Sequence, residues 1–424
     1  MDINKINNSN YFKGALTVQT SSIKKDCSPI FTKEQISQDE SIKGLSIEKR
    51  KKHNKTDYSE IFTKEPFKDY YTEDKSAKVI YDYDEIPQGS HKNVKDARGC
   101  DLTKTFLTRP DIIDMKIDKT TVLSERQAKI LKVPMETAKD PGLGVRTLHA
   151  KGITGKGVKI AIIDEPLSPH KEYANRVINY EETGFAKTPE KGSMQASSVV
   201  SVAAGQTVGT APEAEIVYIA SENSNKNYAD AINRILDLNQ KLPQEEKIPV
   251  ISLSHSFDRE MPDYDLVQQA VSRAKDEDVF VISPSIRLFY NIDLNGANRD
   301  LLKDVNDVQS YSAGANWENS TGRIPLGKRL NTLLVPMDHR TVADYKDGTS
   351  YRYEGNDGGI SLTSPYLAGI YALAVQINPN ITPELFITEA MRTADACRNP
   401  NGILAGRMLN PQKLIDAIKP NPQN

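Results

Sequence analysis

The sequence predicts an α/β fold, a mostly parallel central sheet with helices on both faces, preceded by a polar N-terminal region. Between residues 158 and 282, short β-branched apolar runs alternate with stretches of helical periodicity. Such alternation is typical of a parallel sheet covered on both faces, because each crossover between parallel strands needs a helix. Residues 1 to 138, in contrast, are rich in Lys, Asn, Asp and Ser and lack a sustained hydrophobic period.

Within the α/β region each element has its own sequence signal. Expected strands are 158–163, 216–219, 250–254 and 279–282. Expected helices are 197–204, one carrying Tyr228, Ile232, Ile235 and Leu236 on a single face, and one marked by Leu266, Ala270 and Ala274. A further helix is expected from about 362 to 377. Asp164 follows the first strand, and functional groups gather at the carboxyl ends of parallel strands.

Four segments are predicted along the chain. They are a polar, mobile segment 1–75, an accessory or propeptide-like region 76–138, the α/β domain 139–418 and a tail 419–424. In the accessory region, residues 78–83 alternate like a strand. Ser124 and Gln127 form a capping-box pattern that starts a short helix through Leu131. The basic run 49–55 is diluted by nearby Glu and Asp, which favours a solvated segment over a nucleic-acid site.

Composition narrows the function classes. Hydrophobic residues make up 38% of the chain, charged residues 26%, and the net charge is −2, so neither nucleic acid nor membrane is expected as a partner. No apolar run of spanning length and no signal-peptide pattern is evident, which predicts a cytoplasmic location; the alternative is export without a cleavable signal. Cys27, Cys100 and Cys397 lie far apart and form neither a disulfide framework nor a metal spacing. No metal and no cofactor is therefore expected.

Several motifs occur in a meaningful order. Residues 359–369 read GISLTSPYLAG, residues 152–164 read GITGKGVKIAIID, and residues 210–214 read TAPEA. The segments ISLS (251–254), SAGA (312–315) and LVP (334–336) lie between TAPEA and GISLTSPYLAG, and GRMLN (406–410) follows. Together they resemble the subtilisin-like serine proteases (family S8) over residues 139–418. The resemblance implies a three-layer α/β/α fold, with the catalytic aspartate at Asp164 and the nucleophilic serine at Ser361. It also implies a structural role for His170.

The catalytic histidine of that family has no counterpart here. The histidine segment aligns without gaps on QASSVVSVAAG (195–205), which places Gln195 at the histidine position. A second register puts Lys191-Gly192-Ser193 there, but leaves the following helix out of phase. Neither register supplies an imidazole, and a neutral amide is no general base. The oxyanion asparagine of the family is also missing, since residues 283–288 read SPSIRL.

Other residues are weaker candidates for the site. Ser254 and His255 follow the strand that lines the substrate cleft in the family. We expect His255 to line a side-chain pocket or to pack, with a proton acceptor as the alternative. We expect His339 to be a surface loop residue.

The sequence thus predicts a pseudoprotease with a degenerate triad, which binds a peptide or protein in its cleft instead of cutting it. Its own N-terminal region is a second candidate for the occupant. Family members that have lost triad residues and act as scaffolds or receptors occur among bacterial spore-germination proteins. The alternative is a weakly active serine endopeptidase that uses Ser361 and Asp164 in an unusual way.

Overall fold

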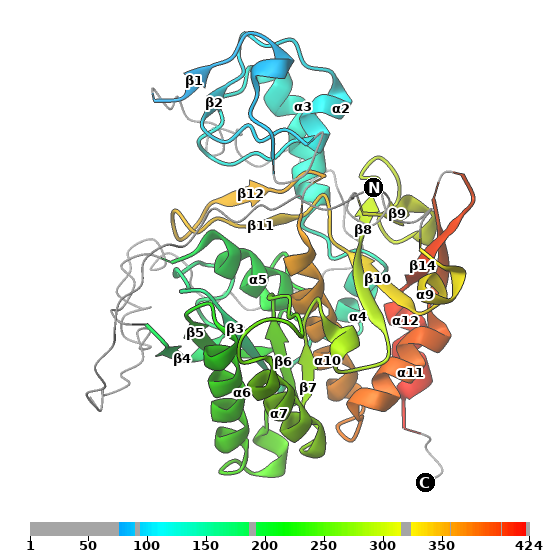
Figure 1. Ribbon diagram of the computed structural model, residues 1–424. Helices are drawn as coiled ribbons and strands as arrows, with labels where there is room; N and C mark the ends of the chain where they lie inside the picture. The colour runs from blue at the N-terminus through cyan, green and yellow to red at the C-terminus, as the bar shows by residue number, and fades with distance from the viewer. Residues whose placement is uncertain are drawn as a thin grey trace, which may run out of the picture.

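A computed structural model describes residues 76–89, 94–185, 192–314, 324–356, 358–399 and 401–420. The predicted mobile segment 1–75 and the last four residues of the predicted tail lie outside these ranges. The described chain forms an α/β body and a smaller lobe, residues 76–138, at the top of Figure 1.

The body is built around a parallel five-stranded sheet in the order β4-β5-β3-β6-β7. Its strands are β3 (Lys159–Asp164), β4 (Val177–Thr183), β5 (Glu215–Ser221), β6 (Val250–Leu253) and β7 (Phe280–Ile282). Residues of the central strands β3, β5 and β6 are almost all buried, because helices cover both faces of the sheet. Four of these strands were predicted; the edge strand β4 was not.

Helices form the outer layers. On one face lie α5 (Met194–Ala204) and α10 (Thr363–Ile377), and on the other lie α6 (Asn225–Asn239) and α7 (Tyr264–Asp276). Alternate residues of β3 separate the two cores: Ile160 and Ile162 pack with α5 and α10, whereas Ala161 and Ile163 pack with α6 and α7. The α/β expectation is confirmed as three layers (Figure 1).

Helix α10 and the preceding 3-10 turn η7 (Ile360–Leu362) correct the expectation that no apolar run reaches the length of a membrane span. The segment Ile360–Ile377 is long and apolar enough to cross a membrane by length and composition. Of this segment, 72% is buried inside the protein, where α10 packs against α5, β3, β6 and β10. Its apolar character is thus explained by its place in the core.

A second sheet extends the body in the order β13-β14-β10-β8-β9. Its strands are β8 (Asp293–Arg299), β9 (Tyr311–Ala313), β10 (Thr332–Pro336), β13 (Asp395–Arg398) and β14 (Leu404–Met408). The segments 312–315 and 334–336, expected to match two later strands, overlap β9 and β10, and β9 runs antiparallel to β8. Strand β10 has two parallel neighbours, β8 and β14, and β8 lies where no strand was expected. The sequence of β8, DLNGANR, is polar and lacks the apolar pattern from which a strand is predicted.

Shorter elements complete the body. These are α4 (Val145–Ala150), α9 (Leu326–Leu330), α11 (Pro383–Thr393), α12 (Pro411–Ile418), the 3-10 turns η4 (Gln244–Glu246), η5 (Ile286–Leu288) and η6 (Val308–Ser310), and the hairpin β11 (Thr341–Ala343) and β12 (Tyr351–Tyr353).

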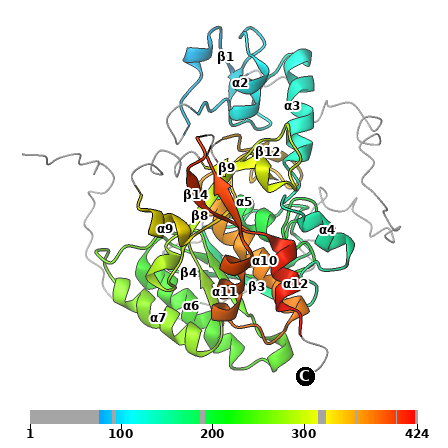
Figure 2. The same cartoon turned by 90° about the vertical axis from the view of Figure 1, so that its right-hand side faces the viewer.

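The lobe contains β1 (Lys78–Val79), β2 (Cys100–Asp101), η3 (Tyr83–Glu85), α2 (Arg109–Asp114) and α3 (Glu125–Thr137). The capping box of Ser124 and Gln127 is present, and the helix continues beyond the predicted end at Leu131 to Thr137. The predicted strand 78–83 is only two residues long, because the chain turns into η3. In Figure 2, α3 runs from the lobe down to the body.

Candidate active site

Asp164 ends strand β3 at the carboxyl edge of the central sheet. Its side chain is buried, with 4% of the residue exposed, and one carboxylate oxygen accepts the backbone N–H of Glu165 at 2.8 Å. Burial raises the pKa of Asp164 to about 7, although hydrogen bonds from Glu165 and Gln195 partly oppose this. The carboxylate therefore titrates near neutral pH.

Gln195 lies directly beside Asp164. Ser193 caps helix α5 by accepting the N–H groups of Gln195 and Ala196, so Gln195 is the second residue of the helix. Its Nε2 donates to Oδ1 of Asp164 at 3.2 Å and to Oδ2 at 3.4 Å. The amide holds the carboxylate as an imidazole N–H would, but it is uncharged and takes up no proton at ordinary pH.

Ser361 is in the turn η7, ahead of α10. Gly359, which precedes the turn, has φ +75°, a conformation that favours glycine. The Ser361 hydroxyl donates to the carbonyl of Ser254 at 3.4 Å, and the Ser254 hydroxyl donates to the carbonyl of Ser361 at 2.8 Å. The turn packs against α5, yet within the described ranges no hydrogen bond joins Ser361 to Gln195.

The described histidines are occupied elsewhere. His149 bonds the carbonyl of Thr210 at 2.8 Å, and His170 bonds that of Ser350 at 2.8 Å. His255 sits between aromatic rings, 4.7 Å from Tyr228 and 5.1 Å from Phe257. Burial lowers the pKa of His255, which disfavours the protonated ring. His53 and His91 lie outside the described residues.

His339 corrects an expectation. It is 4% exposed, not a surface residue, and its Nδ1 lies 2.9 Å from the hydroxyl of Tyr353. That hydroxyl donates to the carbonyl of Ile113 in the lobe, so Nδ1 of His339 is the donor to the Tyr353 oxygen. Sequence position after a proline turn gave no sign of this, because the lobe that covers His339 is distant in the chain.

The segment after β7 presents no amide side chain between 283 and 288. Ser285 exchanges two hydrogen bonds of 2.9 Å with the backbone of Phe257, donating to its carbonyl and accepting from its N–H. Ile286 is fully buried. The segment is therefore packed against the loop after β6 and offers no amide side chain in place of the family's asparagine.

Two arginines and a glutamate support the start of α5, and sequence reasoning missed all three. Arg352 of β12 donates to the carbonyl of Met194 at 3.3 Å and to the hydroxyl of Ser198. Arg98 of the lobe reaches the sulfur of Met194 at 2.7 Å. Glu165 accepts the hydroxyl of Ser193. The Ser193 cap was the one signal available in the sequence.

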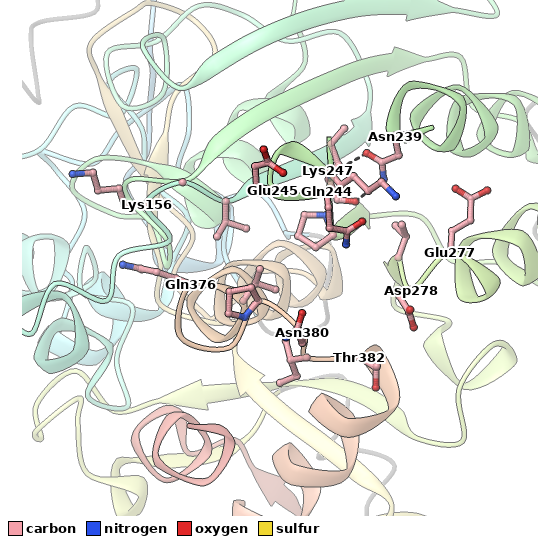
Figure 3. Close-up of a pocket in the computed structure, with 18 residues that line it drawn as sticks. Lys156, Asn239, Gln244, Glu245, Lys247, Glu277, Asp278, Gln376, Asn380 and Thr382 are labelled. Atoms are coloured by element: carbon pink, nitrogen blue, oxygen red, sulfur yellow. Dashed lines mark hydrogen bonds between the residues drawn. The ribbon is translucent and has the colours of Figure 1, made fainter. Parts of the chain in front are cut away.

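A separate pocket of about 470 Å³ opens at the opposite edge of the sheet, where β3, β6 and β7 begin. Lys156, Lys247 and Asp278 are among its lining residues (Figure 3). It is distinct from the edge that carries Asp164. In the part of the chain that the structure describes, no cluster of His, Cys, Asp and Glu could hold a metal ion.

Comparisons with known proteins agree with this fold. No family model matches the chain. Serine protease AprX of Bacillus subtilis (strain 168) is 26% identical over 279 residues, which are 56% of this chain and 61% of AprX. The match therefore spans about three fifths of that relative. It confirms the resemblance to the subtilisin-like serine proteases, and the sheet order and layers described above agree with their fold.

Solved structures include three of similar arrangement. The prenylagaramide maturation protease PagA has a TM-score of 0.45 and 17% identity, covering 65% of this chain and 98% of its own. The PatG macrocyclase domain has a TM-score of 0.46 and 17% identity, and the match covers 65% of this chain and 94% of that domain. The A-subunit of the AB5 toxin from E. coli has a TM-score of 0.49 and 14% identity, and the match covers 66% of this chain and 98% of that subunit.

Proposed function

We propose that this relative of the subtilisin-like serine proteases is catalytically impaired and acts by binding a peptide or protein partner. The observation that carries the proposal is the Asp164–Gln195 pair: the carboxylate that would orient an imidazole is bonded to an amide. A serine hydroxyl needs a neighbouring base before it becomes a strong nucleophile. Ser361 instead donates to the carbonyl of Ser254.

The size of the expected losses in kcat favours catalytic impairment over slow turnover. Loss of the histidine alone costs about 10⁶ in kcat in a subtilisin, and loss of one oxyanion donor costs another 10² to 10³. Both groups are missing from the positions where the family has them. The cleft residues Ser254 and His255 and the position of Ser361 would then serve recognition of the partner.

A weakly active endopeptidase is the second candidate, and one observation favours it. With its pKa near 7, Asp164 is a better proton acceptor at neutral pH than an ordinary aspartate. The carboxylate would have to receive the Ser361 proton through a water molecule. This route predicts that activity rises with pH through about 7.

A fluorophosphonate probe tests the first proposal. The 47.2 kDa chain should keep its intact mass during incubation. Gln195→His should gain a slow adduct that the additional change Ser361→Ala abolishes. An adduct on the wild-type chain that is lost in Ser361→Ala would overturn the proposal and favour the endopeptidase.

Binding is tested separately on an immobilised random-peptide library. Retention of the wild-type protein should fall in His255→Ala, and Leu385→Ala, an exposed change on α11, is the matched control. Equal retention of the two variants would contradict recognition at this site.

A further inference from the structure

The outward face of helix α3 forms a surface distinct from the candidate active site. Arg126, Lys129, Ile130 and Val133 follow one another at the spacing of a single helix face, while Leu131 and Met135 are buried on the other side. With Arg109 and Glu125, these four line a shallow pocket of about 570 Å³. We call these six residues the α3 surface.

The α3 surface combines positive charge with exposed apolar groups. Three of its side chains are cationic and one is acidic, and Glu125 is already bonded to Lys129 at 2.5 Å. Among the described residues, neither Arg109 nor Arg126 forms an ion pair. Val133 is 44% exposed. An occupant that fits both features is an acidic segment that carries apolar or aromatic side chains.

The start of the described chain belongs to the same lobe and is linked to the buried side of α3 by hydrogen bonds. The carbonyl of Ile80, next to β1, accepts the hydroxyl of Thr105 at 2.6 Å. The carbonyl of Thr105 in turn accepts Nε2 of Gln127, in the first turn of α3, at 3.1 Å. Phe106, which follows Thr105, is 78% exposed and adds an aromatic ring beside the helix start. Chain that precedes residue 76 is therefore attached to the lobe that carries the α3 surface.

We propose that the occupant of the α3 surface is the chain's own segment 57–74, which reads DYSEIFTKEPFKDYYTED. It holds six acidic and two basic residues, a net charge of −4, and five aromatic residues. Its charge is opposite to that of the surface, and its aromatic side chains match the exposed Val133 and Phe106. The short link to β1 gives an effective concentration of about a millimolar, so a weak intrinsic affinity is enough.

Photo-crosslinking of the full-length protein tests this docking. A benzophenone amino acid at Val133 should cross-link within the monomer to peptides from 57–74, as identified by mass spectrometry. The matched control carries the same group at Leu385, which is 43% exposed on α11, and should not label this segment.

Two further measurements separate charge recognition from random contact. The double change Arg109→Glu and Arg126→Glu should lower the cross-link yield several-fold with an unchanged melting temperature. Raising salt from about 0.05 to about 0.5 M should lower it as well. Cross-links to any other segment, cross-links between two copies, equal labelling from Leu385, or no cross-link at all would each overturn the proposal.

Discussion

The lobe and the body differ in how they complete their hydrophobic cores. The core of the body is formed from its own strands and helices. The core of the lobe, which includes Ile80, Leu102 and Leu131, also takes in Leu301, Val305 and Tyr353 of the body. A region that borrows part of its core from another is stable only while docked. The lobe is thus an integral part of the described chain.

Polar contacts also hold the lobe against the body, at an interface that we call the seam. Ile117 of the lobe and Tyr353 of β12 exchange backbone hydrogen bonds of 2.9 and 2.8 Å. Buried Glu354 lies between Lys116 of the lobe, at 3.3 Å, and Arg352 of the body. Arg299 of β8, itself 1% exposed, donates to the carbonyl of Ala138, the last residue of the lobe, and to that of Asp140 just after it. The side chains that make these contacts are buried, as in the interior of one domain.

The strongest break of this seam is expected from Glu354→Ala. It leaves two buried cations, Lys116 and Arg352, without their shared carboxylate, so the free energy of unfolding should fall by about 3–5 kcal/mol. Urea unfolding measures this. Glu125→Ala removes a glutamate from an exposed pair and should change stability little. Equal effects of the two variants would contradict the role of the seam.

Asp164→Asn, a change within the body, is expected to raise the free energy of unfolding, whereas Glu354→Ala lowers it. Folding raises the pKa of Asp164 from 3.8 to about 7, so its contribution favours the folded state below pH 3.8 and is lost as pH rises through about 7. The asparagine variant should therefore be more stable than the wild type at pH 8, by about 2–4 kcal/mol. At pH 4 the gain should be close to zero. A gain that is independent of pH would rule out the buried charge as its cause.

Tyr353→Phe is a milder test of the same seam. The change removes the hydroxyl that joins His339 to the carbonyl of Ile113 and leaves both buried groups without this partner. A loss of about 1–3 kcal/mol is expected. Tyr264→Phe on the outer layer of the body is the control. If limited proteolysis does not cut the Tyr353→Phe lobe faster than the control, the hydroxyl is not what holds the lobe.

The smallest effect is expected at the rim of the seam. Lys119 and Asp347 lie 2.5 Å apart, and each side chain is 33% exposed. Lys119→Ala should cost less than about 1 kcal/mol, and the cost should shrink further with added salt. A loss as large as that of Glu354→Ala would show that exposure is a poor guide to the strength of these contacts.

Sequence patterns predicted the body much better than the lobe. Strands β3, β5, β6 and β7 are continuous apolar runs, because both of their faces are buried, and such runs are visible without a structure. Strand β8 is polar and was missed, since pairing with β10 and β9 decides its state. The lobe has few regular elements, and the partners of its core lie more than 150 positions away in Leu301 and Tyr353.

For the candidate site, the chain itself determined the residue types: an aspartate after a buried strand, a glutamine where the family has histidine, and a serine ahead of an apolar helix. Only the tertiary structure decided their partners. It brought the Gln195 amide onto Asp164, turned the Ser361 hydroxyl to Ser254 and placed Arg352 and Arg98 on the start of α5. The physical reason is that residue identity fixes which chemistry is possible, whereas hydrogen bonds and burial depend on neighbours that folding brings from distant parts of the chain.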